Sequence, residues 1–430
     1  MNRQEAEAFV YRSYLKAEPF MDYHARDARK RHPELTEEMI LARCGTPCAV
    51  ITGSKGKGSA AVMMSEILGC RMKTGLMTSP HLTDFCERFR VGGIPCTDEE
   101  FAAGMTDLEA EITRIDSELP DGVCISPVGI QAVFALDYFR KKGTAFNIFE
   151  CGKGARYDDV TQIRHEYAVI NSIFAEHTRE LGDTPEEIAQ DKAHVITGYE
   201  RCAFTAPQSG RVMEILRERA AGKGVPLREY GRDFRAEKIR WTARGMVFDV
   251  VFRDSVCRDM AVPLLGEHQA RNCALAMAAC REIAGLTDEQ AVRERLSSLS
   301  WPGRMEVLSE DPFVLLDACI HPASCGPVLD ALRRLGIEKP AVIIGIPDDK
   351  DYAGVARAMK DAAGCLILTK SQNPHYRFSE VQRQKLLEEG INAVRTESLP
   401  EACALALRAC SPVVILGTTS LVSEAERLSF

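Results

Sequence analysis

A glycine-rich loop at residues 52–59, Thr-Gly-Ser-Lys-Gly-Lys-Gly-Ser, constrains the fold of this chain more than any other segment. An apolar run at residues 49–51 precedes the loop, and a helix-like pattern follows it from residue 60. This order of strand, glycine loop and helix is typical of a phosphate-binding loop, because glycines let backbone N–H groups turn toward phosphates and the helix N-terminus adds partial positive charge. In this interpretation Lys57 reaches the terminal phosphates and the Ser59 hydroxyl ligates Mg²⁺.

The loop departs from the common spacing G-x-x-x-x-G-K-[ST], because Gly58 separates Lys57 from Ser59. The alternative is a glycine-rich turn with a solvated lysine, and the flanking strand and helix argue against it. The predicted nucleotide-binding residues of the loop are Gly53, Ser54, Gly56, Lys57, Gly58 and Ser59.

Composition excludes several classes of protein. A chain of 430 residues exceeds one ordinary hydrophobic core and predicts two or three domains. The net charge of −8 argues against a general nucleic-acid-binding surface, and the sequence has no run of about 18 apolar residues that would span a membrane. The charged N-terminus lacks the apolar segment of a secretory signal. Sixteen scattered cysteines without a C-x-x-C pair indicate reduced thiols, so we expect a cytoplasmic protein, and we expect it to be a monomer.

From residue 49 to about residue 205, short apolar runs alternate with longer helical patterns. Such alternation predicts a mostly parallel sheet with helices on both faces. Two of the helices begin with capping-box sequences, at Thr97 and at Thr184. The expected strands are residues 48–52, 75–78, 145–150, 168–172 and 202–205, and the expected helices are residues 58–68, 98–115, 128–140 and 185–197.

The pattern changes after residue 227. Residues 239–242 and 246–252 predict an antiparallel hairpin, and residues 269–284 predict a helix. A proline-glycine break at residues 301–304 indicates a hinge, after which the α/β alternation resumes. The later strands are expected at residues 313–317, 341–345, 365–369 and 413–417, and the later helices at residues 322–335, 353–362 and 400–409.

The predicted fold class is therefore α/β. We expect a phosphate-loop (P-loop) central domain over residues 1–300, with an N-terminal extension at residues 1–47 and a small antiparallel element. A smaller, Rossmann-like α/β domain should follow over residues 304–430. In open parallel sheets ligands bind beyond the carboxyl ends of the strands, which is where the glycine loop lies.

Polar residues follow two other predicted strands. Glu150 ends an apolar strand beside a glycine-containing loop, where a carboxylate can hold Mg²⁺ directly or through water. The alternative is a glutamate that caps a solvated loop. His177 and Lys192 lie after the next strand, and neither residue type is informative alone, because most histidines and lysines at such positions are structural or solvated.

The chain resembles the folylpolyglutamate synthase/dihydrofolate synthase family, relatives of the Mur ligases of cell-wall synthesis. The matching stretches run in family order from about residue 48 to the end, whereas the first forty residues match poorly. They comprise residues 52–59, 78–82 with 87–88, 150–156, 177–184, 187–193, 265–269 with Asn272, 301–304, 349–351 and 417–424.

In that family ATP phosphorylates a substrate carboxylate, and an amine then attacks the acyl phosphate to form an amide. The resemblance implies that Lys57 and Arg304 neutralise charge on the transferred phosphoryl group. It also implies that Ser59 and Glu150 hold one Mg²⁺ ion. The implied partners of the protein are therefore small molecules, namely ATP, a carboxylic acid and an amino acid.

The resemblance implies a second Mg²⁺ ion held by His177 and Lys192. In relatives this lysine is carbamylated by CO₂ and so becomes an anionic ligand. An unmodified lysine would repel a metal ion, whereas the carbamate attracts it. Asn272 and Asp317 are expected to contact adenine and ribose. The expected substrate residues are Ser79, His81, Arg88, Arg156, His321 and Thr418.

Several residues depart from the family pattern. Where the family has Asp-Gly-Ala-His-Asn-Pro, residues 317–322 read Asp-Ala-Cys-Ile-His-Pro, so that Ile320 stands in the place of a histidine associated with the incoming glutamate, unless His321 replaces it. Thr418 aligns with a family serine and keeps the hydroxyl. Residues 126–129 read Ser-Pro-Val-Gly instead of Thr-x-Phe-Glu, and the missing aromatic ring weakens the case for stacking of a pterin.

Three hypotheses follow. The first is a true folate enzyme in which the substrate-pocket residues have changed by sequence drift. The second is a paralogue that joins a different carboxylate to a different amine. Both keep the ATP and metal residues, and the residues of the site rather than the fold must decide between them. The third, a nucleotide-binding protein without acceptor chemistry, is the weakest, because an idle site has no need of two metal-ligand sets.

Overall fold

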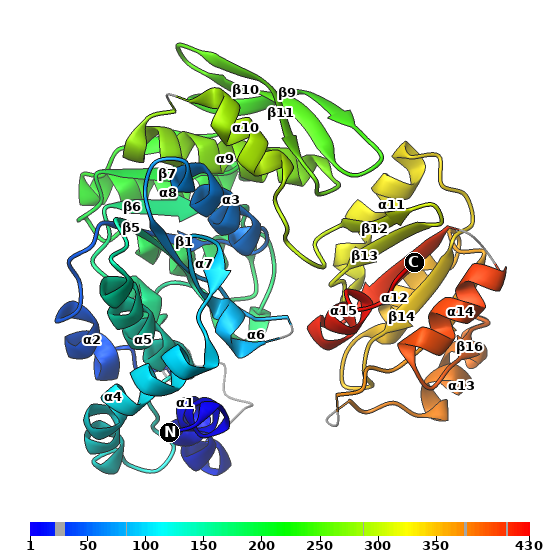
Figure 1. The fold of residues 1–430 in the computed structure, drawn as a ribbon, viewed down its shortest axis with the longest axis horizontal. Helices are drawn as coiled ribbons and strands as arrows, with labels where there is room; N and C mark the ends of the chain where they lie inside the picture. Colours follow the sequence, from blue (N-terminus) through cyan, green and yellow to red (C-terminus); the bar gives the residue numbers. More distant parts are fainter. Residues whose placement is uncertain (22–30, 83, 287, 374–375, 410–411) are drawn as a thin grey trace. The chain divides into compact units, whose positions relative to one another are not determined.

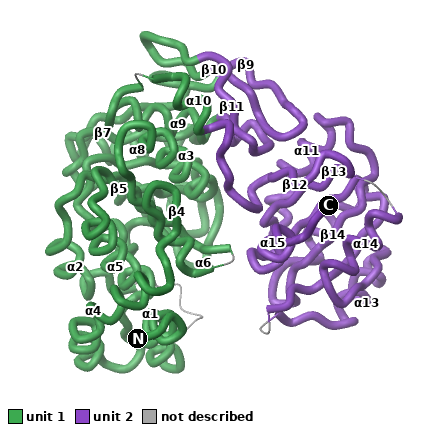
Figure 2. The backbone as a smooth tube through the Cα atoms, viewed as in Figure 1, with its two compact units in different colours: residues 1–236, 250–257, 271–295 green, residues 237–249, 258–270, 296–430 purple. Residues whose placement is uncertain are grey.

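The computed structural model describes residues 1–21, 31–82, 84–286, 288–373, 376–409 and 412–430, and its elements are labelled in Figure 1. The chain divides into two compact units, which are coloured in Figure 2. Unit 1 comprises Met1–Ala236, Val250–Cys257 and Arg271–Arg295, and unit 2 comprises Glu237–Asp249, Arg258–Ala270 and Leu296–Phe430.

Unit 1 is built on an eight-stranded sheet with the order β4-β3-β2-β5-β1-β6-β7-β8. The strands β2, β5, β1, β6, β7 and β8 run parallel to one another, and β3 and β4 add antiparallel pairs next to β2 at one edge. Every residue of the central strands β1, β5 and β6 is buried, as expected for parallel strands covered on both faces. The strands are β1 Cys48–Thr52, β2 Thr74–Met77, β3 Phe89–Val91, β4 Ile94–Pro95, β5 Phe146–Glu150, β6 Tyr167–Ile170, β7 Cys202–Thr205 and β8 Leu227–Glu229.

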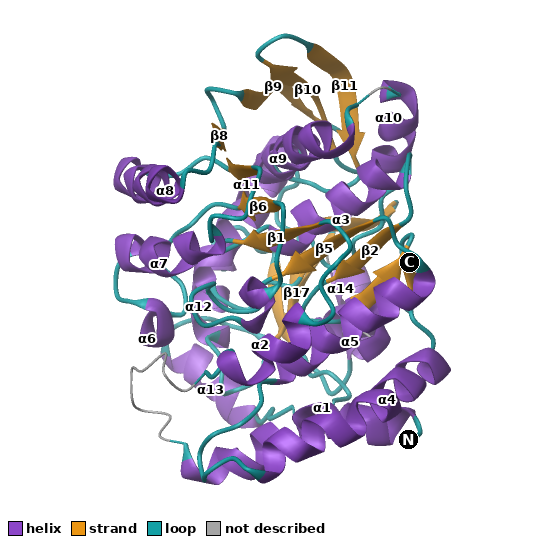
Figure 3. Cartoon of the chain, turned by 90° about the vertical axis from the view of Figure 1, so that its left-hand side faces the viewer, coloured by secondary structure: helices purple, strands orange, loops and turns teal. Residues whose placement is uncertain are grey.

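Helices lie on both sides of this sheet, as Figure 3 shows. The sequence predicted α3, α4 and α5 to within two residues, whereas α7 begins as predicted but ends at Lys192 instead of residue 197, and α1 and α2 were not predicted. These two N-terminal helices pack against α4 and α5 and extend the core around them. The helices are α1 Arg3–Ala17, α2 Glu34–Leu41, α3 Lys57–Gly69, α4 Asp98–Ser117, α5 Pro127–Lys142, α6 Thr178–Leu181, α7 Pro185–Lys192, α8 Gly210–Lys223, α9 Glu267–Ala284 and α10 Glu289–Ser297.

The two predicted capping boxes have different outcomes. At Thr97 both halves form, because the Thr97 hydroxyl accepts from Glu100 N and the Glu100 carboxylate accepts from Thr97 N. At Thr184 the hydroxyl accepts from Glu187 N, but the Glu187 carboxylate accepts from Asp183 N at 2.6 Å instead of from Thr184. The prediction of a complete box at Thr184 is therefore wrong, and a neighbouring backbone donor is the reason.

The predicted hairpin corresponds to β9 Phe234–Trp241 and β10 Met246–Phe252, which are neighbours in a three-stranded sheet. The turn is closed by a hydrogen bond from Thr242 N to Gly245 O at 2.9 Å. A third strand, β11 Val256–Val262, completes this sheet and was not predicted.

Unit 2 contains a six-stranded sheet with the order β12-β13-β17-β14-β15-β16. All neighbours in it are parallel except β12 and β13, so the expected Rossmann-like α/β architecture is confirmed. No helix among the described residues is long and apolar enough to cross a membrane. The elements are β12 Glu306–Glu310, β13 Phe313–Asp317, β14 Ala341–Gly345, β15 Cys365–Leu368, β16 Val394–Arg395 and β17 Val413–Gly417, with α11 Cys325–Arg334, α12 Tyr352–Met359, α13 Glu380–Glu388, α14 Leu399–Ala409 and α15 Thr419–Ala425.

Unit 1 also contains a fully buried ion pair between His165 and Glu200. The Nε2 atom of His165 lies 3.1 Å from Glu200 Oε1 and 2.9 Å from the Val195 carbonyl, and Nδ1 lies 2.6 Å from the Ile163 carbonyl. Both ring nitrogens therefore face acceptors. Burial alone would lower the pKa of His165, but the hydrogen bond and charge of Glu200 overcome burial and raise it. The same pairing, against burial, lowers the pKa of Glu200 to about 2.

We predict that Glu200→Gln lowers the free energy of unfolding by about 3 kcal/mol near pH 6, because it leaves a buried imidazolium without its counter-charge. The raised pKa of His165 means that its contribution is complete below about pH 6.5 and is lost as pH rises through the folded-state pKa. Urea unfolding at pH 6 and pH 9 should therefore show a larger pH-dependent loss for the wild type than for the variant. The control is Glu282→Gln, which breaks a half-exposed pair with Arg228 and should cost less than about 1 kcal/mol. Equal losses for both substitutions would contradict the prediction.

Candidate active site

The glycine loop leaves the carboxyl end of β1, which is hydrogen-bonded to β5 on one side and β6 on the other. The register pairs Ile51 with Glu150 and Thr52 with Ile170. Glu150 and Asn171, the residue after Ile170, therefore end the two strands that flank the start of the loop. Parallel pairing around β1 is what brings together residues that are about 100 positions apart in the sequence.

The conformation of the loop requires glycine at two positions. Gly53 has φ 140° and Gly56 has φ 89°, both in the region that side chains disfavour. A Cβ atom at Gly53 would lie 2.6 Å from Asn171 Cβ, and one at Gly56 would lie 2.7 Å from Asn272 Oδ1. The Ser54 side chain ties the loop to the segment after β6, since its hydroxyl accepts from Phe174 N at 3.1 Å and donates to Phe174 O at 3.0 Å.

Two lysine side chains converge on the carbonyl of Gly53. Lys57 Nζ donates to Gly53 O at 3.2 Å, and Lys192 Nζ donates to the same oxygen at 2.9 Å. Lys192 is 1% exposed and forms an ion pair with Glu176 at 3.0 Å. Burial, and then the nearby charge of Lys57, lower the pKa of Lys192, while Glu176 opposes the shift. Two lysine nitrogens therefore meet at the end of β1, and Glu176 supplies a negative charge to one of them.

Ser59 and Glu150 are oxygen donors of the kind that Mg²⁺ prefers. Ser59 lies in the first turn of α3, where it is 4% exposed, and Glu150 is 5% exposed at the end of β5. Glu150 Oε2 accepts from Ser79 N at 3.0 Å, which orients the carboxylate. A hydroxyl and a carboxylate at the carboxyl edge of one sheet fit a magnesium ion.

His177 precedes α6 and adopts a left-handed conformation with φ 48°. Together with Glu176 it follows β6, and Lys192 ends α7. An imidazole and a carbamylated lysine would form a donor set of the kind expected for a second metal. In the structure the unmodified Lys192 ammonium instead forms an ion pair with Glu176, a residue that sequence reasoning missed. Its position directly before His177, after a strand, was the available signal.

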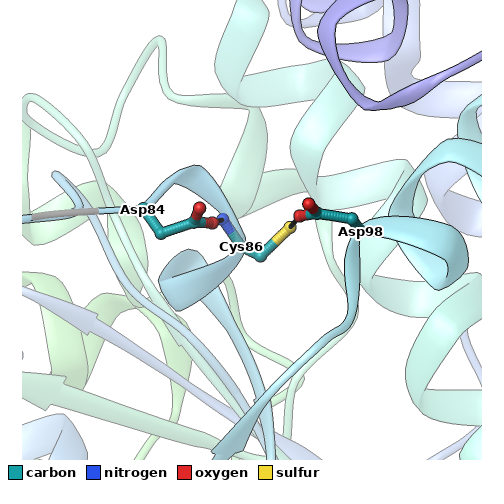
Figure 4. Close-up of side chains that lie close together, drawn as sticks. All are labelled: Asp84, Cys86 and Asp98. Atoms are coloured by element: carbon teal, nitrogen blue, oxygen red, sulfur yellow. Dashed lines mark hydrogen bonds between the residues drawn. The ribbon is translucent and has the colours of Figure 1, made fainter.

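A different cluster in unit 1 brings three potential metal ligands within 4.8 Å of one another. Across the described parts of the chain this is the group Asp84, Cys86 and Asp98, drawn in Figure 4. The Arg3 guanidinium already pairs with both carboxylates, donating to Asp84 Oδ1 at 3.0 Å and to Asp98 Oδ1 at 2.9 Å. The cluster therefore anchors helix α1 to the start of α4.

Among the predicted substrate residues of unit 1, His81 and Arg88 are joined directly. Arg88 Nε donates to His81 Nδ1 at 2.8 Å, and Nη1 donates to Gln131 Oε1 at 2.8 Å. Burial lowers the pKa of Arg88, and burial followed by the charge of Arg88 lowers the pKa of His81, which keeps this imidazole neutral. Ser79 contacts Glu150 through its backbone, whereas the exposed Arg156 stacks over the Tyr157 ring at 5.2 Å.

A cavity of about 570 Å³ opens beside His177 in unit 1. Sequence reasoning missed its N-terminal wall, because the first forty residues carry no motif. Val128 lines the cavity, and the neighbouring Gly129 has no room for a side chain, since a Cβ atom there would lie 2.3 Å from Asp159 Oδ1. The lining residues include Tyr14, Met21, Arg31, Cys124, Val128, Tyr157, Asp159 and His177.

The remaining predicted site residues belong to unit 2. Arg304 and Asp317 are neighbours there, because Asp317 Oδ2 accepts from Met305 N at 2.9 Å and Ala318 N donates to Gly303 O at 2.9 Å. His321 and Ile320 are exposed, and the Thr418 hydroxyl lies 3.3 Å from Ser420 Oγ at the start of α15. Thr418 N also donates to Gly345 O at 3.1 Å.

Comparison with known proteins identifies the class of the chain. Residues 120–280 match the family model of the Mur ligase middle domain, and residues 303–419 match that of the Mur ligase glutamate ligase domain. The chain is 32% identical over 327 residues to a probable bifunctional folylpolyglutamate synthase/dihydropteroate synthase of Halobacterium salinarum, which covers 74% of this chain and 40% of that relative. It is 27% identical to the folylpolyglutamate synthase of Lacticaseibacillus casei over 87% of each sequence.

A solved FPGS–AMPPCP–folate complex has the same fold, with a TM-score of 0.80, 25% identity and coverage of 99% of both chains. The two family models define the class, a protein built from the two Mur ligase domains. Within that class the chain belongs to the folylpolyglutamate synthase/dihydrofolate synthase family. It spans less than half the length of the archaeal relative.

We predict that Gly56→Ala weakens nucleotide binding at least tenfold, because the new Cβ atom displaces the Asn171 and Asn272 amides and strains the loop. Isothermal titration with a non-hydrolysable ATP analogue measures the effect. Gly222→Ala is the matched control, since open space surrounds Gly222 near the end of α8. Unchanged affinity in the Gly56 variant would show that the loop does not bind the nucleotide.

Proposed function

We propose that the protein is an ATP-dependent ligase that joins the carboxylate of a small-molecule acid to the amine of an amino acid. The observation that carries the proposal is the convergence of Lys57 and Lys192 on the Gly53 carbonyl, beside the buried oxygen donors Ser59 and Glu150. The solved complex of similar fold, which holds AMPPCP and folate, supports a nucleotide and a carboxylic acid as the ligands.

The reaction has two balanced steps. A carboxylate oxygen of the acid attacks the γ-phosphorus of ATP, so that ADP leaves and an acyl phosphate forms. The amine then attacks the acyl carbon, inorganic phosphate leaves, and the amine proton passes to solvent. Lys57 would neutralise charge on the transferred phosphoryl group.

Magnesium would be held by Ser59 and Glu150, and a second ion by His177 and carbamylated Lys192. When bound, such ions supply Lewis-acid stabilisation of phosphoryl oxygens. Ser79 N keeps Glu150 oriented for this task. In unit 1 Asn272 would contact adenine.

Carbamylation of Lys192 requires the neutral amine, whose nitrogen attacks CO₂ and releases one proton. Burial lowers the pKa of Lys192 and so favours that neutral form. Its ion pair with Glu176 must open for the new carboxylate to turn toward a metal.

The cavity beside His177 would hold the acid substrate. Tyr14, Met21 and Tyr157 offer it an apolar wall, while Asp159 supplies a buried carboxyl group whose pKa burial raises to about 6. Folate or pteroate is our first candidate, with glutamate as the amine. A non-folate acid or another amine is favoured by two observations, the small Val128 side chain in the cavity wall and the exposed Ile320 beside Asp317.

We expect ADP release only when an acid and an amine are both present. The assay crosses dihydropteroate, tetrahydrofolate and unrelated carboxylates with the common amino acids. Lys57→Ala should reduce the rate by at least about a thousandfold, because it removes a preorganised charge from the phosphoryl group. Lys55→Ala is the control, an exposed lysine of the same loop. Full activity of the Lys57 variant would remove this residue from the mechanism, and ADP release without any acid and amine would refute the ligase.

Substitution of Lys192 by Ala should abolish most turnover, and short carboxylic acids such as acetate should restore part of it by replacing the missing anion. A second measurement does not depend on activity. Wild-type protein in ¹³C-labelled bicarbonate should show a carbamate signal by NMR, and the Lys192 variant should lack it. A wild type without that signal in the presence of Mg²⁺ and nucleotide would refute the carbamate.

A further inference from the structure

The loop that joins β13 to α11 in unit 2 carries a cysteine at each end. Cys319 lies two residues after the last residue of β13, and Cys325 is the first residue of α11. Their Sγ atoms are 3.6 Å apart, which is a hydrogen-bond contact between two thiols. The S–S bond of a disulfide is about 2.05 Å long, so the two sulfurs need to approach by only about 1.5 Å to be joined.

The fold holds both cysteines in place. Cys319 is 0% exposed and Cys325 is 1% exposed, and both belong to the hydrophobic core of unit 2. The backbone before Cys319 is fixed by a hydrogen bond from Ala318 N to Gly303 O at 2.9 Å, and α11 packs its buried side chains on the same core. The contact between the sulfurs is therefore a product of the tertiary structure.

The segment between the two cysteines is more exposed than the cysteines themselves. Ile320 is 37% exposed, and His321 is exposed as well. The His321 carbonyl lies 3.6 Å from Cys319 Sγ and accepts from Ser324 N at 2.9 Å, so this short turn covers the sulfur. Local opening of an exposed turn requires less free energy than unfolding of the core. Such an opening gives a small oxidant access to the thiols.

The contact between the sulfurs also affects their reactivity. The hydrogen bond with Cys325 and then burial raise the pKa of Cys319. Because the thiolate is the nucleophile, the first attack on an oxidant is slow at neutral pH and becomes faster as pH rises. The second step needs no further encounter, because the second thiol already lies beside the first. A product that joins the two sulfurs is therefore favoured over further oxidation of either one.

We propose that Cys319 and Cys325 form a redox modification site, which hydrogen peroxide converts reversibly into a disulfide. One thiolate attacks a peroxide oxygen, the O–O bond breaks, and the departing hydroxide takes up the thiol proton, which leaves a sulfenic acid and water. The second thiolate attacks the sulfenic sulfur, the S–S bond forms, and the departing hydroxide takes up the second proton. Two thiols are oxidised, one peroxide is reduced, and two water molecules are released. The modification is independent of the proposed ligase activity.

The test uses the full chain in its native state. Protein treated with hydrogen peroxide is quenched with catalase, unfolded in N-ethylmaleimide and digested with trypsin. Residues 305–333 form one tryptic peptide, which contains Cys319 and Cys325 and no other cysteine. Most of this peptide should carry no maleimide and have a mass two hydrogens below that of the dithiol. Dithiothreitol added before the maleimide should restore both labels. A peptide that keeps both labels after peroxide treatment would overturn the inference.

Cys403 provides the matched control in the same digest. It is a buried thiol of unit 2, 6% exposed, and among the described residues no other thiol contacts it. Residues 396–408 form its tryptic peptide, which should keep the label. Cys319→Ser and Cys325→Ser should each abolish the species that is two hydrogens lighter. Equal loss of label from Cys403, or a disulfide from Cys319 or Cys325 to any other cysteine, would contradict a dedicated pair.

Discussion

The site depends on one carbonyl group, that of Gly53, held at the end of the central strand between two lysine ammonium groups. Glu176 compensates Lys192, which leaves the charge of Lys57 for a bound anion. The N-terminus of α3 follows the loop directly and also attracts anions. This edge of the sheet therefore favours an anion, and the buried Lys192 lies beside it.

The strand order explains why these charged side chains lie so close to one another. With β1 between β5 and β6, the residues after three buried strands meet at one edge, and each strand is anchored by its neighbours along its length. Glycine is needed at positions 53 and 56 because the flanking segments leave no space for a Cβ atom. The rigid strands thus fix the positions of the side chains at this edge, and the glycines of the loop let its backbone lie close to the neighbouring segments.

The proposed acid cavity departs from the expected family pattern more than the glycine loop does. Gly129 stands where the resemblance to the family leads us to expect a glutamate, and Asp159 from the loop after β5 occupies the space that a side chain there would need. A carboxyl group is thus delivered to the cavity wall from a different element. This exchange was not apparent from either sequence segment alone, since residues 129 and 159 meet only in the fold.

The sequence by itself determined the α/β class, the central strands and the phosphate loop, because buried parallel strands read as continuous apolar runs and the loop must contain glycine. It left α1 and α2 without a signal, since their burial depends on packing against α4 and α5 rather than on a local motif. Only the tertiary structure decided that Lys192 pairs with Glu176, that Asn171 contacts Asn272, and that the N-terminal segment lines the cavity. Those contacts join residues distant in the sequence, and no local periodicity encodes a long-range hydrogen bond.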